Sequence, residues 1–214
     1  MVAVPVHQQD QVLALLKQKG MVRLSEFAQI GVAATTVSRM EKAGLVVKLG
    51  RGVYQLPDAI IDANHDLAEA VTLIPRGIIC LVSALSFHEL TDTIPPHVWV
   101  AIGSRDWRPS TSHLPLEIVR FNANLLNTGT ETHTIEGVSV RITNPAKTIV
   151  DMFRYRKSEG VRFRQSPGLN LALEGMREAL RQRKATPADI ADYAGKAGIW
   201  KIVRPYLEAM TANA

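Results

Sequence analysis

The chain has 214 residues, a formal net charge of +5 and a sequence pI of about 9.5, a length that allows one large domain or two smaller ones. Apolar residues make up 46% of it, which excludes an intrinsically disordered protein, and no apolar run is long enough to predict a membrane span. The N-terminus lacks the basic segment of a secretory signal, and the one cysteine, Cys80, has no partner for a disulfide within the chain. We therefore expect a cytoplasmic protein.

The charge is unevenly distributed along the chain. Residues 1–58 carry a net charge of +3, residues 59–140 a net charge of −5 and residues 141–183 a net charge of +6. Two basic blocks therefore flank an acidic middle. Local potential, more than total charge, attracts a polyanion, so this clustering is informative about partners.

The first 58 residues contain three short helical patterns followed by a hairpin pattern. We expect helices in residues 10–20, 24–31 and 32–44, each with a glycine at its end. Two β-prone runs then flank Leu49-Gly50-Arg51-Gly52, where glycine permits the tight turn. In this order the elements predict a winged helix-turn-helix whose third helix enters a major groove.

The third helix and the hairpin carry the candidate DNA contacts. Projected at 100° per residue, Ala33, Val37 and Met40 share one face. The opposite side is small and basic, and its hydroxyl and cationic groups suit phosphates and base edges. The candidate DNA-binding residues, including the cations of the hairpin, are Thr35, Thr36, Ser38, Arg39, Lys42, Lys48 and Arg51. The alternative is an ordinary solvated helix face beside an exposed turn arginine.

A polar stretch with Pro57, at residues 56–66, marks the expected boundary between a domain at 1–58 and a second domain at 59–214. The second domain reads as α+β, with a small mostly antiparallel sheet followed by helices. Strands are expected at 97–102 and 116–121, and a hairpin about Glu136-Gly137. Residues 78–90 are expected to begin as a buried segment and continue as a helix, and Asn144 and Thr186 are expected N-caps of two later helices. The other expected helices of this domain are at 66–77, 144–156, 169–183, 186–198 and 199–210, the last interrupted by Pro205.

Two stretches resemble the AbiEi family, the antitoxins of type IV toxin–antitoxin systems. One is the predicted winged helix that ends in "LGRGVYQLP" (49–57), and the other is "NPAKTIVDMFRYRKSEG" (144–160) followed by "LNLALEGMREAL" and "IVRPYLEAM". The resemblance implies that the N-terminal winged helix binds inverted repeats in its own operon's promoter and represses transcription. It also implies that the second domain counteracts a co-encoded nucleotidyltransferase-like toxin without forming a stable complex with it.

The second basic block lies at the end of a predicted helix and in the segment after it. Its cations are Arg154, Arg156, Lys157, Arg162 and Arg164. One interpretation is a second polyanion surface, which would contact operator DNA or an RNA and serve antitoxicity. The other is structural, because cations favour the C-terminal end of a helix dipole.

The sequence contains no persuasive catalytic, metal-binding or cofactor-binding set, so we expect a protein that is not an enzyme. The six histidines are scattered without ligand spacing. A nucleic-acid-processing enzyme would need carboxylates that converge on a metal, for example Asp92, Asp106, Glu117 and Asp151. A plain winged-helix regulator with a ligand-sensing or dimerising second domain is another alternative. The loop "IGSRDWRP" (102–109) either holds a substrate or is packed around Trp107.

Overall fold

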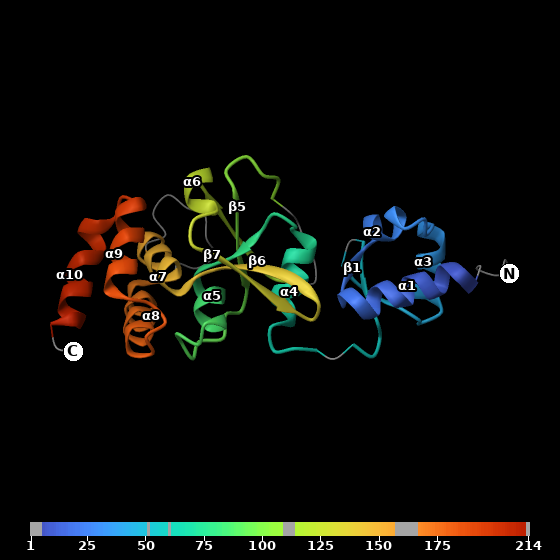
Figure 1. Ribbon diagram of the computed structural model, residues 1–214, viewed down its shortest axis with the longest axis horizontal. Helices are drawn as coiled ribbons and strands as arrows, with labels where there is room; N and C mark the ends of the chain where they lie inside the picture. Colours follow the sequence, from blue (N-terminus) through green and yellow to red (C-terminus); the bar gives the residue numbers. More distant parts are fainter. Residues whose placement is uncertain (1–5, 51, 60, 109–113, 157–166, 213–214) are drawn as a thin grey trace. The chain divides into compact units, whose positions relative to one another are not determined.

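The computed structural model describes residues 6–50, 52–59, 61–108, 114–156 and 167–212 (Figure 1). The chain divides into two compact units. The first comprises Met1–Arg76, Pro109–Leu114 and His133–Val140, and the second comprises Gly77–Arg108, Pro115–Thr132 and Arg141–Ala214. None of the helices in the described part of the chain is long and apolar enough to cross a membrane.

The first unit begins with the predicted helices and wing. The helices are α1 (Val6–Lys19), α2 (Leu24–Gln29) and α3 (Ala34–Lys42). The wing strands β2 (Val47–Gly50) and β3 (Val53–Gln55) form an antiparallel sheet with β1 (Val22–Arg23), in the order β1-β3-β2. Strand β1 was not predicted, because two residues between helices are too short to show a periodicity.

One small apolar core holds these elements together. Val12 and Leu16 of α1, Phe27 of α2 and Val37 of α3 are all at most 1% exposed. Tyr54 of the wing packs edge-on against Phe27, with ring centroids 6.3 Å apart. The wing is therefore anchored to the helices through Tyr54.

Helix α4 (His65–Leu73) follows the wing and belongs to the same unit. Arg23 of β1 connects it to the winged helix, because the Arg23 guanidinium donates to the carbonyl oxygens of Thr72 and Leu73, the latter at 2.6 Å. These are among the last carbonyls of α4, which lack partners within the helix. Partial burial lowers the pKa of Arg23, although Glu26 opposes this effect.

The tip of the β7–β8 hairpin also belongs to the first unit. Strands β7 (Thr130–Ile135) and β8 (Val138–Thr143) are joined by Glu136 and Gly137, whose φ angles of 49° and 77° are those of the predicted tight turn. The Glu136 carboxylate accepts from the Asp62 backbone N–H at 2.6 Å and lies 2.9 Å from His65 Nδ1. The end of α1 lies against this turn.

The second unit contains a mixed sheet. Strands β4 (Ile78–Ile79), β5 (Val98–Gly103) and β6 (Leu116–Phe121) join β7 and β8 in the order β6-β5-β4-β8-β7. The α+β class is confirmed, but the sheet is mixed rather than mostly antiparallel, since β5–β6 and β4–β8 are parallel pairs. A two-residue turn reveals a hairpin, whereas parallel pairing across a long connection has no local signal.

Helices surround the core of the second unit. Two confirmed N-caps fix helix starts: Asn144 accepts from the Lys147 backbone N–H at 2.8 Å, and Thr186 forms a capping box with Asp189. The last helix continues through exposed Pro205, which lacks a backbone N–H and so removes one hydrogen bond inside the helix. The helices are α5 (Leu81–Phe87), α6 (Ala123–Leu126), α7 (Pro145–Arg154), α8 (Leu169–Arg181), α9 (Pro187–Lys196) and α10 (Trp200–Thr211).

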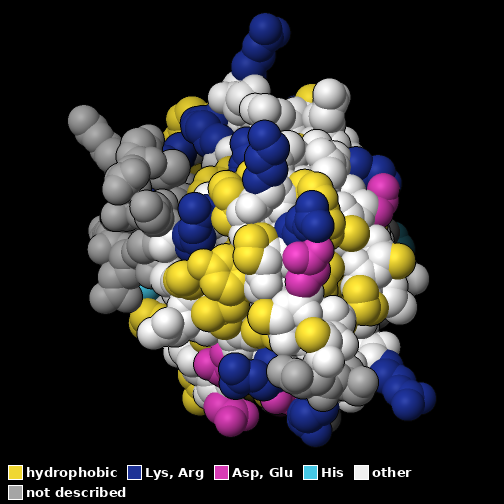
Figure 2. Space-filling model, turned by 90° about the vertical axis from the view of Figure 1, so that its left-hand side faces the viewer, with side chains coloured by type: hydrophobic (Ala, Val, Ile, Leu, Met, Phe, Trp, Pro, Cys, Tyr) yellow, Lys and Arg dark blue, Asp and Glu magenta, His cyan; other side chains and the backbone are white. Residues whose placement is uncertain are grey.

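Figure 2 shows the face of the second unit that carries the C-terminal helices, where hydrophobic side chains gather near the centre with charged side chains round them. Half-buried Tyr206 and Met210 of α10 pack against the core. Two of the cations are paired within their own helices, Lys196 with Asp192 and Arg204 with Glu208 at 2.7 Å. Such pairs make this face less attractive to a polyanion.

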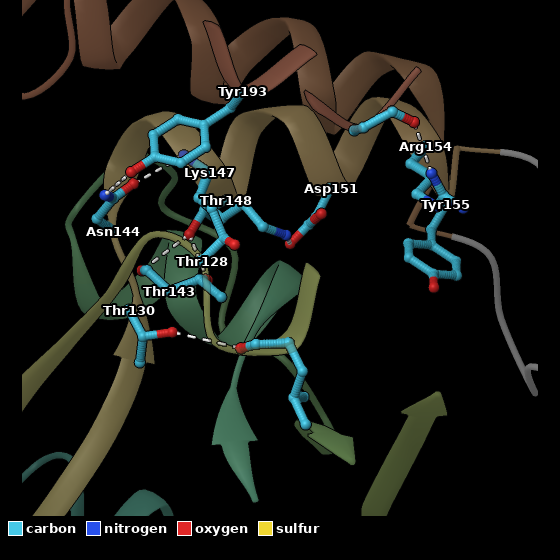
Figure 3. Close-up of polar contacts among 12 residues, drawn as sticks. Thr128, Thr130, Thr143, Asn144, Lys147, Thr148, Asp151, Arg154, Tyr155 and Tyr193 are labelled. Atoms are coloured by element: carbon cyan, nitrogen blue, oxygen red, sulfur yellow. Dashed lines mark hydrogen bonds and ion pairs between the residues drawn. The ribbon is translucent and has the colours of Figure 1, made fainter. Parts of the chain in front are cut away.

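A buried ion pair lies in the middle of α7 (Figure 3). Lys147 Nζ donates to Asp151 Oδ2, and both residues are 1% exposed. Lys147 Nζ also lies 4.7 Å from the centroid of the Phe121 ring. Burial raises the pKa of Asp151 from 3.8 to about 6, against the opposing attraction of Lys147. Asp151 therefore pairs with the residue one turn before it on its own helix.

We expect the wild-type chain to lose stability, relative to a Lys147→Met/Asp151→Leu variant, as the pH rises from about 4 to about 7. The raised pKa of Asp151 means that the folded chain holds a proton which the unfolded chain has lost. That stabilisation is complete below pH 3.8 and disappears as the pH passes about 6, and it amounts to at most about 3 kcal/mol. Apolar replacement of both partners of a buried pair is often neutral or stabilising.

Urea denaturation followed by tryptophan fluorescence measures this difference, since Trp99, Trp107 and Trp200 all lie in the second unit. The single variant Lys147→Met is the control, because it leaves the buried Asp151 without its partner and should cost about 3–5 kcal/mol at neutral pH. Parallel pH profiles for the wild type and the double variant would contradict the effect of burial on Asp151.

Gly20 allows the end of α1 to meet the β7–β8 turn. Its φ is 70°, and a Cβ atom there would lie 1.8 Å from the Glu136 carbonyl oxygen. Gly44 has the same backbone conformation, with φ 72°, but open space where its Cβ would be. We expect Gly44→Ala to cost about 1 kcal/mol from backbone strain alone, and Gly20→Ala to cost clearly more. Thermal unfolding followed by circular dichroism compares the two, and equal losses would show that this contact does not stabilise the fold.

Candidate nucleic-acid interface

Helix α3 is oriented by the face that it buries. Val37 and Met40 are at most 1% exposed, in the core shared with α1 and α2. Thr36 lies on the same side at 4% exposure, and its hydroxyl donates to Gln8 Oε1 of α1 at 2.6 Å. Because α3 has 3.6 residues per turn, burial of this side turns the other side outward.

The outward side of α3 carries most of the predicted contact residues. Thr35, Arg39 and Lys42 are exposed, and Ser38 is half-buried between them. Lys48, on the adjoining wing strand β2, is also exposed and pairs in register with Tyr54. Arg39 and Lys42 stand in the last turn of α3, where cations also suit the helix dipole.

Thr36 is a correction to the predicted set. Its hydroxyl is used inside the protein and its side chain is buried, so it cannot reach DNA. The helical projection placed it at the flank of the outward side, where a rotation of some tens of degrees decides between burial and exposure. Its partner Gln8 lies before the predicted start of the first helix, so no local pattern indicated this bond.

The wing is held by its backbone. Gly52 has a φ of 72°, and its carbonyl oxygen accepts from the Leu24 N–H at the start of α2 at 2.7 Å. A register shift between Lys48 and Gly50 bends β2 beside the turn. Burial, with a contribution from Glu41, raises the pKa of Tyr54 at the base of the wing. Arg51 lies outside the described residues.

The second basic block is described only in part (Figure 3). Arg154 Nη1 donates to the Ala197 carbonyl oxygen at 2.9 Å, at the end of α9, and Arg156 Nη1 donates to the Phe153 carbonyl oxygen at 2.8 Å. Both residues are half-buried. These contacts agree with the structural interpretation of the block for the two arginines. Lys157, Arg162 and Arg164 lie outside the described residues.

The carboxylates considered for an enzyme have separate roles. Asp106 accepts from the Gly103 N–H at 2.9 Å, Asp151 pairs with Lys147, and Glu117 is buried on β6 at 2% exposure, while Asp92 is exposed. Within the described ranges, His, Cys, Asp and Glu side chains nowhere form a group of three that could hold a metal ion. Burial, followed by the nearby Asp151 carboxylate, raises the pKa of Cys80, which leaves its thiol protonated.

The three helices, the β1-β3-β2 sheet and the outward face of α3 together define a winged helix-turn-helix. Residues 10–57 match a family model described as "Transcriptional regulator, AbiEi antitoxin". The predicted resemblance to this family is confirmed for that segment, which supports a DNA-binding regulator of the antitoxin type.

The crystal structure of the RV2827C protein from Mycobacterium tuberculosis is similar to this chain over nearly its whole length. The match has a TM-score of 0.59 at 12% sequence identity, and it covers 98% of this chain and 82% of the other. At this identity the likeness concerns the fold alone. The comparison with curated proteins gives no match.

Proposed function

We propose that the protein is the antitoxin of a type IV toxin–antitoxin system. In this proposal residues 1–58 form a domain that binds inverted repeats in the operon's promoter and represses transcription. Residues 59–214 form a domain that counteracts a nucleotidyltransferase-like toxin without a stable complex. The observation that carries the proposal is the small, basic and exposed face of α3, on a segment that matches a family of regulators.

The contact residues divide by their chemistry. Thr35, Ser38 and Arg39 are short or planar donors on the outward face of α3, so we assign them to base edges and nearby phosphates. Lys42, Lys48 and Arg51 lie toward or on the wing, and we assign them to the phosphate backbone. Inverted repeats require two copies of the domain, related by the two-fold symmetry of the DNA. The protein would act in the cytoplasm, where the operon is.

A second candidate is a winged-helix regulator whose second domain senses a ligand or dimerises. It is favoured by one observation: the family match ends at residue 57 and does not extend into the second domain. The neighbouring gene separates the two candidates, because the antitoxin proposal requires that it encode a nucleotidyltransferase-like protein. Neither candidate includes a catalytic residue or a cofactor.

For operator binding we expect Arg39→Ala and Arg51→Ala each to weaken binding to the promoter duplex. Each lost phosphate contact should also lower the slope of log K against log salt by about one. Gel shifts at several salt concentrations measure both quantities. Lys201→Ala, which removes an exposed cation of α10, is the matched control and should change neither. Unchanged affinity and slope for Arg39→Ala would remove α3 from the interface, and the same result for Arg51→Ala would remove the wing.

For antitoxicity we expect a Lys157→Ala/Arg162→Ala/Arg164→Ala variant to protect cells poorly against the toxin of the adjacent gene. These three cations are chosen because Arg154 and Arg156 already bond to helix ends. Growth on co-expression with the toxin gives the readout, and Arg177→Ala/Arg183→Ala removes other exposed cations as a control. A folded triple variant that protects fully would assign the whole block to a structural role.

A further inference from the structure

The loop after β5, residues 103–108, presents an exposed tryptophan between two arginines. Trp107 is 74% exposed, and Arg105 and Arg108 are exposed as well. The sequence left open whether Trp107 is packed within its loop, and this exposure excludes that. A large aromatic side chain left in water with cations on both sides is a feature of surfaces that bind a partner.

The backbone of this loop is held in place. The Asp106 N–H donates to the Gly103 carbonyl oxygen at 3.1 Å, and the Asp106 carboxylate accepts from the Gly103 N–H at 2.9 Å. Arg120 Nη1, from the adjacent strand β6, donates to the carbonyl oxygens of Gly103 at 3.1 Å and Ser104 at 2.8 Å. These bonds hold Gly103, Ser104 and Asp106 in place before a ligand binds, which lowers the entropy cost of ordering the start of the loop.

The same strand connects the loop to the end of α7. The Tyr155 hydroxyl donates to the Arg120 carbonyl oxygen at 3.2 Å, and the Tyr155 ring stacks on Phe121 with centroids 5.6 Å apart. Arg156 follows Tyr155 directly. Arg120 therefore contacts both the start of the loop, through its guanidinium, and the end of α7, through its carbonyl oxygen.

We propose that residues 103–108 bind single-stranded nucleic acid, with the Trp107 indole stacked on an unpaired base and with Arg105 and Arg108 on the flanking phosphates. Stacking needs a free base face, which an intact duplex does not offer within its helix. This function goes beyond operator binding and does not use α3. Single-stranded RNA and single-stranded DNA share this chemistry, and the experiment below distinguishes them.

The test is fluorescence anisotropy of the full chain with labelled RNA of about 12 unpaired nucleotides, within the range of single-strand site sizes. We expect Trp107→Ala to weaken binding about 5- to 150-fold, and Trp107→Phe to keep most of the affinity. Arg105→Ala and Arg108→Ala should each reduce the salt slope by about 0.7. Ile94→Ala, which removes an 88% exposed apolar side chain of the same unit, should have no effect.

Several results would overturn the proposal. They are the absence of single-strand binding by the wild type, a Trp107→Ala affinity equal to that of the wild type, and a loss of affinity in Ile94→Ala as large as that in Trp107→Ala. The proposal would also be overturned if Trp107→Ala lost affinity for the promoter duplex and kept its affinity for the single strand. The affinity for a single-stranded DNA of the same sequence shows whether the site prefers RNA or DNA. Arg39→Ala should keep its affinity for the single strand, and Trp107→Ala should keep its affinity for the promoter duplex. The two variants therefore test the single-strand proposal and the operator proposal independently.

Discussion

The burial of one face of α3 is the constraint on which the proposed DNA-binding surface depends. Val37 and Met40 occupy the core of the winged helix, and the Thr36 hydroxyl is bonded to α1. A helix fixed on one side by apolar packing has no freedom to turn, so its remaining residues must face outward. The face that results is suitable for a groove because it carries small hydroxyl side chains and its C-terminal end is basic.

In the second unit, helix α7 is the element that the core fixes in place, as α3 is in the winged helix. Its buried residues contact the sheet and the C-terminal helices, and its middle holds the pair of Lys147 and Asp151 in the core. Burial of a charge here costs free energy, and the same burial raises the pKa of Asp151 because it disfavours the charged carboxylate. At its basic end, Arg154 and Arg156 satisfy helix carbonyls. Net charge along a sequence therefore says little about which cations remain available to a polyanion.

Local signals in the sequence predicted the elements well. Asn144 and Thr186 marked helix starts, and Glu136-Gly137 marked the hairpin, because caps and tight turns depend on neighbouring residues only. The parallel pairing of β5 and β6 and the bond of Thr36 to Gln8 depend on residues distant in the chain, and no local pattern encodes them. The exposure of Trp107 has the same origin, since only the fold decides whether a loop aromatic is covered.

The central claim is that α3 and the wing form the surface that meets operator DNA. Amide hydrogen exchange of the full chain, with and without a duplex that carries the inverted repeats of its promoter, tests this most directly. The account predicts slower exchange on binding in Ala34–Lys42 and in the wing strands Val47–Gly50 and Val53–Gln55, with little change in Trp200–Thr211. Protection confined to the second unit, with none in α3, would contradict it.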